Sequence, residues 1–200
     1  MRRALVRVVL AALAFLILCS ASSAFAAPGR YLHIRVDGVI NPIKQRYVER
    51  SLARAVEERA DFLLITIDTP GGLVSSLQNI TTAITNAPLP VVGFVEPQSA
   101  QATSAGAFIL LATDVAAMAP GTRVGAAHPV GGDKPLEGAM DEKATNSLAS
   151  LVKSLAARRG RPPAPAEAMV RESKSFTETE AKAAGLIEIL AVNRAHLLSE

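Results

Sequence analysis

Cysteine, tryptophan and aromatic side chains in general are scarce in this sequence. Its 200 residues include one Cys and no Trp, and aromatic residues make up 4% of the chain. Half of the residues are nevertheless hydrophobic and a fifth are charged, a balance that excludes a disordered chain and allows one globular domain with a sizeable core. The shortage of aromatics favours an α/β domain over an aromatic platform for nucleic acid.

The chain also lacks a surplus of positive charge outside its N-terminal segment. The net charge is +3, but Arg2, Arg3 and Arg7 lie in the first 26 residues, where no acidic residue occurs. The remaining basic residues equal the 18 acidic residues in number. We therefore expect no surface that binds nucleic acid or another polyanion through charge alone.

Residues 1–26 have the features of a secretory signal peptide. A basic start is followed by a short apolar run and by Ala24-Phe25-Ala26, which fits the small-x-small cleavage pattern. The alternative is an uncleaved membrane anchor, for which the run is short. Leu18 before Cys19 disfavours a lipoprotein site. Cleavage after Ala26 leaves residues 27–200 as one exported domain without cysteine, which excludes disulfides, cysteine nucleophiles and thiolate metal sites.

The rest of the chain alternates between strand and helix patterns. Strands are predicted at 31–40, 61–70, 88–97, 115–120, 124–130 and 186–190, and helices at 42–56, 73–84, 104–114, 141–159, 165–173 and 178–184. The first helix has an apolar stripe at Ile43, Tyr47, Val48, Leu52 and Val56, and 104–114 is apolar all round. Residues 131–138 are rich in glycine and predicted to be mobile. The alternation favours a parallel sheet covered by helices.

Two short motifs lie where strands are predicted to end. Asp68-Thr69-Pro70-Gly71-Gly72-Leu73-Val74 closes one strand, and Ala102-Thr103-Ser104-Ala105-Gly106-Ala107 opens the buried helix. Glycines at such a turn allow close backbone approach, and a helix start offers N–H groups to an oxyanion. Taken singly, the first motif is explained as an ordinary strand–helix turn, and Ser104 as a helix cap. Neither has the spacing of a nucleotide-binding loop.

Together the two motifs resemble the Clp-protease/crotonase superfamily, and within it the NfeD-type membrane-associated serine proteases. The resemblance covers residues 31–192 and includes Met118-Ala119-Pro120-Gly121-Thr122, Gly125-Ala126-Ala127-His128-Pro129 and Glu142-Lys143-Ala144-Thr145-Asn146. It implies an α/β fold with a Clp-protease/crotonase-like parallel sheet of ββα-type units covered by helices. It also implies that Ser104 is the nucleophile and that N–H groups of Gly71 or Gly72, with that of Ala105, form the oxyanion hole.

The base that would activate Ser104 is a separate question, because a serine hydroxyl needs a proton acceptor. The resemblance assigns Lys143, although this residue lies off the apolar stripe of its helix and needs cover from the glycine-rich segment or a partner subunit. His128 is the alternative, one residue out of register with the histidine of the Clp triad. Lys153 is interpreted as a surface residue, Lys134 lies in the glycine-rich segment, and His33 and His196 lack metal-site spacing.

Three functions follow from these alternatives. The first is an ATP-independent serine endopeptidase with a Ser-Lys dyad and no cofactor. The resemblance implies that its substrates are stomatin-like membrane-associated proteins, which it cuts near apolar C-terminal segments. It also implies assembly as a homodimer. The second is a catalytically silent module that binds a membrane protein. A crotonase-type thioester enzyme is the third, and an export signal argues against it. Relatives commonly continue into membrane helices and a small β-barrel, whereas this sequence stops at Glu200.

Overall fold

The computed structural model describes residues 29–131 and 138–200. The predicted signal peptide and most of the glycine-rich segment, with Lys134, lie outside these ranges. The first half contains β1 (Tyr31–Asp37), α2 (Pro42–Glu57), β2 (Phe62–Asp68), α3 (Val74–Thr85), β3 (Val91–Val95), β4 (Gln101–Thr103), α4 (Ala105–Ala112) and β5 (Val115–Met118). The second contains β6 (Arg123–Gly125), α5 (Gly138–Arg158), α6 (Pro163–Arg171), β7 (Ser175–Thr177), α7 (Glu178–Ala183), β8 (Ile189–Leu190) and α8 (Arg194–Leu197).

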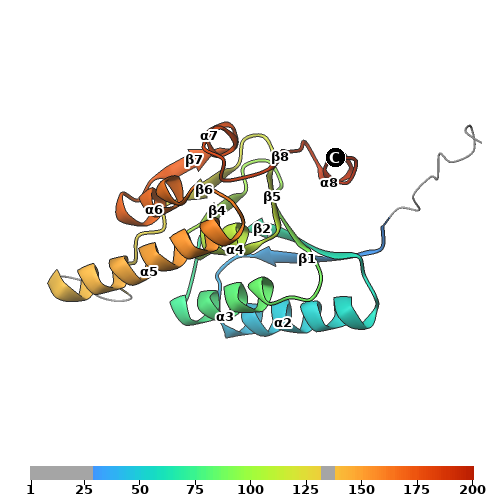
Figure 1. The fold of residues 1–200 in the computed structure, drawn as a ribbon, viewed down its shortest axis with the longest axis horizontal. Coiled ribbons are helices and arrows are strands. Elements are labelled where there is room, and N and C mark those ends of the chain that lie inside the picture. The colour runs from blue at the N-terminus through green and yellow to red at the C-terminus, as the bar shows by residue number, and fades with distance from the viewer. Residues whose placement is uncertain (1–28, 132–137) are drawn as a thin grey trace, which may run out of the picture.

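The main sheet is parallel throughout, as predicted. Its strand order is β1-β2-β3-β5-β8, so each crossover moves in the same direction along the sheet. Because such crossovers are right-handed, the connecting helices gather on one face, where α2 and α3 lie side by side (Figure 1). The opposite face has a smaller core, formed by Leu64, Phe94, Ala117, Ala119, Ala191 and Leu197.

A second, smaller sheet was not predicted. β4 pairs in parallel with β6, and β6 pairs antiparallel with β7. A bridge between Thr69 and Ala102 joins the end of β2 to β4. Strands of three residues lack a periodic pattern of their own, so only their long-range pairing identifies them. The predicted strand at 124–130 ends at Gly125, because Gly125 and Ala126 turn the chain with φ values of 126° and 46°.

The apolar stripe predicted for the first helix is only partly correct. Asn41 caps α2 by accepting hydrogen bonds from two backbone N–H groups, as its position predicts. The side chains that α2 buries are Val48, Ser51, Leu52 and Ala55. Ile43, Tyr47 and Val56 are exposed instead, because small side chains on a neighbouring stripe allow closer packing of the helix on the sheet.

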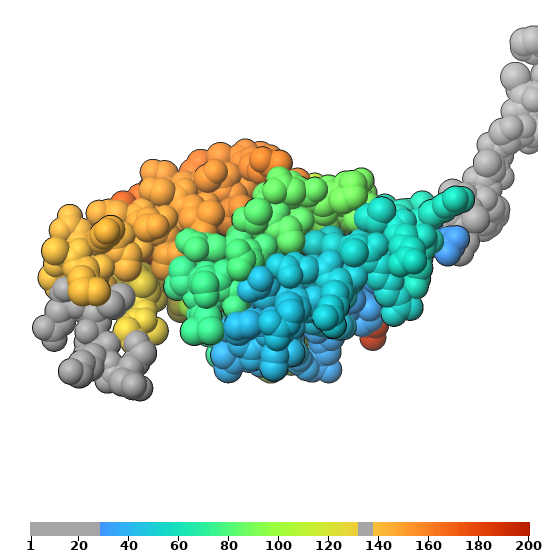
Figure 2. Space-filling view, turned by 90° about the horizontal axis from the view of Figure 1, so that it is seen from below, coloured from blue at the N-terminus to red at the C-terminus, as the bar shows by residue number. Residues whose placement is uncertain are grey.

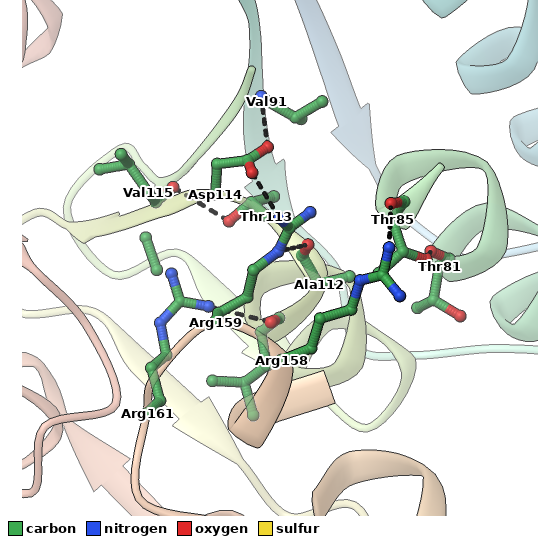
Figure 3. A network of polar contacts seen from close by, with 12 residues as sticks. Thr81, Thr85, Val91, Ala112, Thr113, Asp114, Val115, Arg158, Arg159 and Arg161 are labelled. Atoms are coloured by element: carbon green, nitrogen blue, oxygen red, sulfur yellow. Dashed lines mark hydrogen bonds and ion pairs between the residues drawn. The ribbon is translucent and has the colours of Figure 1, made fainter. Parts of the chain in front are cut away.

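Helix α4 is the centre of the molecule, and every one of its residues is buried. Two arginines that follow α5 in the sequence hold the C-terminal end of α4 (Figure 3). Arg159 Nε donates to the carbonyl of Ala112 at 2.8 Å, and Arg161 Nη1 donates to that of Leu111 at 2.9 Å. Arg161 also makes a two-pronged ion pair with Glu188, with both contacts at 2.8 Å. Cations at a helix C-terminus satisfy carbonyls that lack intrahelical partners.

We expect Arg161→Met to destabilise the fold by about 2–4 kcal/mol, since it leaves a buried carbonyl of α4 without a donor and Glu188 without its partner. Urea unfolding measures the change. Arg54→Ala is the control, because Arg54 pairs with Glu58 on the exposed surface of α2 and should have little effect. Equal midpoints for the two variants would contradict this assignment.

Candidate active site

Ser104 lies at a strained turn between β4 and the first residue of α4. Its backbone has φ 53° and ψ −117°, a conformation that costs a residue with a side chain about 1–3 kcal/mol. Its N–H donates to the carbonyl of Gly125 at 2.9 Å, which fixes the turn against β6. The Ser104 side chain makes no capping hydrogen bond to α4. A simple capping role therefore does not explain this serine, whose half-buried hydroxyl stands beside the helix start.

The two glycines of the first motif permit two different close approaches. A Cβ on Gly71 would lie 2.6 Å from Ser104 Cβ and 3.0 Å from Ser104 Oγ. A Cβ on Gly72 would lie 2.1 Å from the carbonyl oxygen of Ile40, with which Gly72 forms a parallel bridge. Contacts under 3.0 Å cannot be accommodated, so neither position tolerates a side chain without movement. The structure thus brings Gly71 and Ser104 into contact across two motifs that are 33 residues apart.

The N–H groups near Ser104 are not equivalent. That of Gly71 donates to Thr69 Oγ1 at 3.1 Å, so it is already occupied. Within residues 29–131 and 138–200, no hydrogen bond involves the N–H of Gly72 or that of Ala105. Ala105 is the first residue of α4, where N–H groups have no intrahelical acceptor. The available donors beside the serine are therefore Gly72 and Ala105, and Gly71 supplies space.

Thr69 belongs to the first motif and has a structural role that the motif alone did not predict. Its side chain is fully buried. Oγ1 donates to the carbonyl of Gly38 at 2.5 Å and accepts from the N–H of Gly71. This hydroxyl therefore orients the Pro70-Gly71 turn from within. A threonine before Pro-Gly in a strand-end motif is the signal that could have indicated it.

Lys143 lies in the second turn of α5, away from the packed face of the helix. α5 buries Thr145 and Leu148, and Lys143 precedes Thr145 by two residues, about 200° around the helix axis. Residues 138–140, 142 and 143 are all exposed. The first turns of α5 project beyond the sheets in Figure 1 and stand on the same side of the molecule as the start of α3 in Figure 2. In the described part of the chain, no hydrogen bond or ion pair joins Lys143 to Ser104.

His128 does not lie on a strand, contrary to the prediction for 124–130. Its Nδ1 is 3.1 Å from the carbonyl oxygen of Val170 at the end of α6. Its Nε2 is 3.3 Å from Asp141 Oδ1 on α5. Both ring nitrogens are therefore engaged by acceptors, and neither is paired with Ser104. Its side chain does not follow strand alternation, because the chain has already turned at Gly125 and Ala126.

The other candidate residues have ordinary surroundings. His33 lies 3.1 Å from Thr66 Oγ1 and 3.2 Å from a guanidinium nitrogen of Arg194, and burial, with a smaller effect of that charge, lowers the pKa of His33. His196 pairs with Glu200, and Lys153 with Glu167 on the surface. Over residues 29–131 and 138–200, no group of His, Cys, Asp or Glu side chains could hold a metal ion. No helix in the same ranges is long and apolar enough to cross a membrane.

Comparison with known proteins finds similar chains in an archaeon and in a bacterium. The chain is 34% identical over 169 residues to the membrane-bound protease PH1510 of Pyrococcus horikoshii, and 34% identical over 145 residues to the membrane protein NfeD1b of Bacillus subtilis. These alignments cover 83% and 72% of the chain. The chain spans only 38% and 32% of the lengths of these two relatives.

Solved structures show the same fold. The 1510-N membrane-bound stomatin-specific protease, as a serine-to-alanine mutant, matches with a TM-score of 0.81 and 32% identity over 86% of this chain and 84% of the other. A lysine-to-alanine mutant in complex with a substrate peptide gives the same TM-score and identity, over 86% and 80% of the two chains. ClpP1 of Listeria monocytogenes, at 22% identity and a TM-score of 0.65 over 82% of this chain and 94% of that one, shares the fold.

A family profile also matches this chain. The profile described as NfeD1b, N-terminal domain, matches residues 31–197, nearly all of the described chain. That range includes both strand-end motifs, α4 and α5. With its Clp-like α/β architecture, the chain belongs to the family of NfeD1b N-terminal domains.

Proposed function

We propose that this chain is a serine endopeptidase in which Ser104 is the nucleophile. The observation that carries the proposal is the strained turn at Ser104, packed against Gly71 and followed by the start of α4. Strain of this kind persists only where the surrounding structure imposes it, and it is common at active sites. A serine at a sharp strand-to-helix turn is also the arrangement in which hydrolases expose a nucleophile.

The oxyanion hole of this peptidase consists of the N–H groups of Gly72 and Ala105. Gly72 is exposed and its N–H has no partner in the described structure, so a substrate carbonyl can reach it. Two preorganised donors stabilise the negative charge that develops on that carbonyl oxygen when Ser104 attacks. The absence of a side chain at Gly71 leaves room beside Ser104 Oγ for the scissile bond.

Lys143 is the proposed base. A neutral Lys143 amine accepts the proton from Ser104 Oγ as the oxygen bonds to the scissile carbonyl carbon, and then donates it to the amine that leaves. The solved relatives support this choice, since they include a serine mutant and a lysine mutant. In that protein the mutated serine precedes the mutated lysine by about forty residues, as Ser104 precedes Lys143. His128 is a weaker candidate because acceptors engage both of its ring nitrogens.

The exposure of Lys143 is the observation that favours a second candidate, a catalytically silent module that binds a membrane protein. A base must come within hydrogen-bond distance of the hydroxyl that it deprotonates. Lys143 is exposed, and it would do so through a rearrangement of the first turns of α5 or from a second copy of the chain, as in a homodimer. Without either event, the site retains its surface for a peptide but no dyad.

The proposed substrates are apolar segments of stomatin-like membrane-associated proteins. Four exposed apolar side chains surround the Ile40–Gly72 bridge beside the oxyanion donors: Val39, Ile43, Leu73 and Val74, whose exposed fractions are 57%, 69%, 54% and 43%. This surface, which we call the apolar rim, suits an apolar peptide better than a charged one. Solved relatives with the same fold are described as stomatin-specific proteases, and an exported domain would meet such substrates at a membrane.

Ser104→Ala should lower the turnover of a peptide with an apolar, stomatin-like C-terminal segment by at least about a thousandfold, because it removes the nucleophile. Lys143→Ala should lower it by at least about a hundredfold. His128→Ala should be at least as active as the wild type. Peptide cleavage followed by mass spectrometry, with circular dichroism to check folding, gives the measurement.

Each contrary outcome of this experiment has a definite meaning. Loss of activity in a folded His128→Ala variant would assign the base to the histidine. Equal cleavage by the wild type and Ser104→Ala would reveal a contaminating protease. Peptide binding without cleavage by the wild type would favour the silent binding module.

Gly71→Ala should abolish most activity, since its Cβ would lie 2.6 Å from Ser104 Cβ and push the nucleophile out of position. Gly38→Ala is the matched control. Gly38 also has a positive φ, 64°, but a Cβ there meets nothing within 4 Å, so only the backbone cost of about 1 kcal/mol applies. Peptidase rates and thermal unfolding of both variants separate the two effects. Full activity in Gly71→Ala would exclude the proposed site geometry.

Ile43→Gln should raise the KM for an apolar peptide by about tenfold while leaving kcat and stability nearly unchanged, since Ile43 is exposed in the apolar rim. Val56→Gln makes the same kind of change at the other end of α2, where Val56 is 46% exposed. Steady-state kinetics on one peptide compares the two variants. An equal effect of both would show that the rim does not contact substrate.

A further inference from the structure

A hydrogen-bonded segment leads from the nucleophile to the helix that carries Lys143. Gly125 accepts from the N–H of Ser104. The next residue, Ala126, donates its N–H to the carbonyl of Lys174 at 2.8 Å, and Ala127 donates to that of Met169, also at 2.8 Å. Residues 125–127 are therefore held between the turn at Ser104 and the C-terminal end of α6. This backbone is a fixed support for the residue that follows it, His128.

His128 connects the backbone of residues 125–127 to the start of α5. Its ring lies between the carbonyl oxygen of Val170, at 3.1 Å from Nδ1, and the carboxylate of Asp141, at 3.3 Å from Nε2. Both neighbours are acceptors, so an imidazole with N–H groups on both nitrogens satisfies both. The His128 and Asp141 side chains are each 34% exposed, so solvent screens this contact only in part.

Asp141 is the first residue of α5 that the rest of the molecule holds. Residues 138–140 before it are exposed. Further along, Asn146 accepts from Arg171 Nη1 at 2.9 Å, and Lys153 pairs with Glu167. These later contacts fix the middle of α5 to α6, whereas the turn that contains Lys143 is fixed on its N-terminal side by Asp141 alone among the described contacts.

The direction in which Asp141 is held determines the direction of Lys143. The two residues are about 200° apart around the helix, so Lys143 faces solvent when Asp141 faces His128. In this arrangement Lys143 is exposed, and no hydrogen bond within residues 29–131 and 138–200 joins it to the half-buried Ser104. Unwinding or rotation of the first two turns of α5 would bring the lysine inward, and either movement breaks the contact between His128 and Asp141.

We propose that His128 and Asp141 form a latch that holds the first two turns of α5 in a resting arrangement, with Lys143 turned to solvent, and that release of this latch precedes formation of the Ser104–Lys143 dyad. The inference rests on the proposed peptidase function and concerns the regulation of the same site. It makes His128 a positioning residue that acts through α5. The latch also gives a role to His128, which makes no contact with Ser104 in the described part of the chain.

Asp141→Ala tests the latch, with Glu142→Ala as the matched control. Glu142 is the next residue on α5, is exposed and carries the same charge, so both variants lose one acidic group from the same helical turn. Hydrogen–deuterium exchange should become at least threefold faster in residues 138–144 of Asp141→Ala, because the variant lacks the contact with His128. It should stay unchanged in Glu142→Ala.

Peptidase kinetics supplies the second readout. Asp141→Ala and His128→Ala should each raise kcat severalfold with little change in KM, and the double variant should exceed neither single variant, because the two side chains act through one contact. Unchanged exchange in Asp141→Ala would overturn the latch, and so would a fall in kcat in that variant. If the wild type cleaves no peptide, the proposed function fails, while the exchange experiment still decides whether the contact holds α5.

Discussion

The close approach of Gly71 to Ser104 is the contact on which the site depends. It joins the end of the main sheet to the start of α4, and it exists because one of the two residues has no side chain. The strained backbone of Ser104 is supported from the other side by the carbonyl of Gly125 in the small sheet. The strained backbone at Ser104 persists because the main sheet, the small sheet and α4 meet there and hold it in place.

The rigidity of this half of the site comes from the burial of α4. All eight of its residues are buried, and its last carbonyls accept hydrogen bonds from Arg159 and Arg161. Since α4 is short, fixing its C-terminal end also fixes the turn at its N-terminal end. The buried Gly71, the half-buried Ser104 and the two N–H donors therefore form a preorganised unit, as oxyanion stabilisation requires.

The other half of the proposed site has the opposite character. Lys143 lies on exposed turns at the end of a long helix, and the contacts nearest to it join Asp141 to His128 and Asn146 to Arg171. A rigid nucleophile combined with a loosely held base suits an enzyme whose activity depends on a rearrangement, since elements that move are drawn from the least stable parts of a fold. The apolar rim lies beside the rigid half, so peptide binding there need not await the lysine.

Local sequence determined most of the architecture. The run from Ser104 to Ala112 predicted a buried helix because it is apolar on every face, and the runs around β2 and β3 predicted strands buried on both sides. The Pro-Gly-Gly and Thr-Ser-Ala-Gly motifs, considered together, indicated the half of the proposed site that holds Ser104 and the N–H donors. Asn41 predicted the start of α2, since a cap acts on the two or three residues that follow it.

Tertiary structure decided what depends on contacts between distant residues. The small sheet forms because three-residue strands find partners 22 to 54 residues away, as Ala102 does with Val124 and Val124 with Phe176. Ile43 and Val56 are exposed because α2 packs through Ser51 and Ala55 instead. The position of His128 against Asp141 and the outward face of Lys143 depend on how α5 lies on α6. The sequence by itself determined which residues could perform the chemistry; packing decided which of them stand together, because one helix face or one turned residue reverses the direction of a side chain.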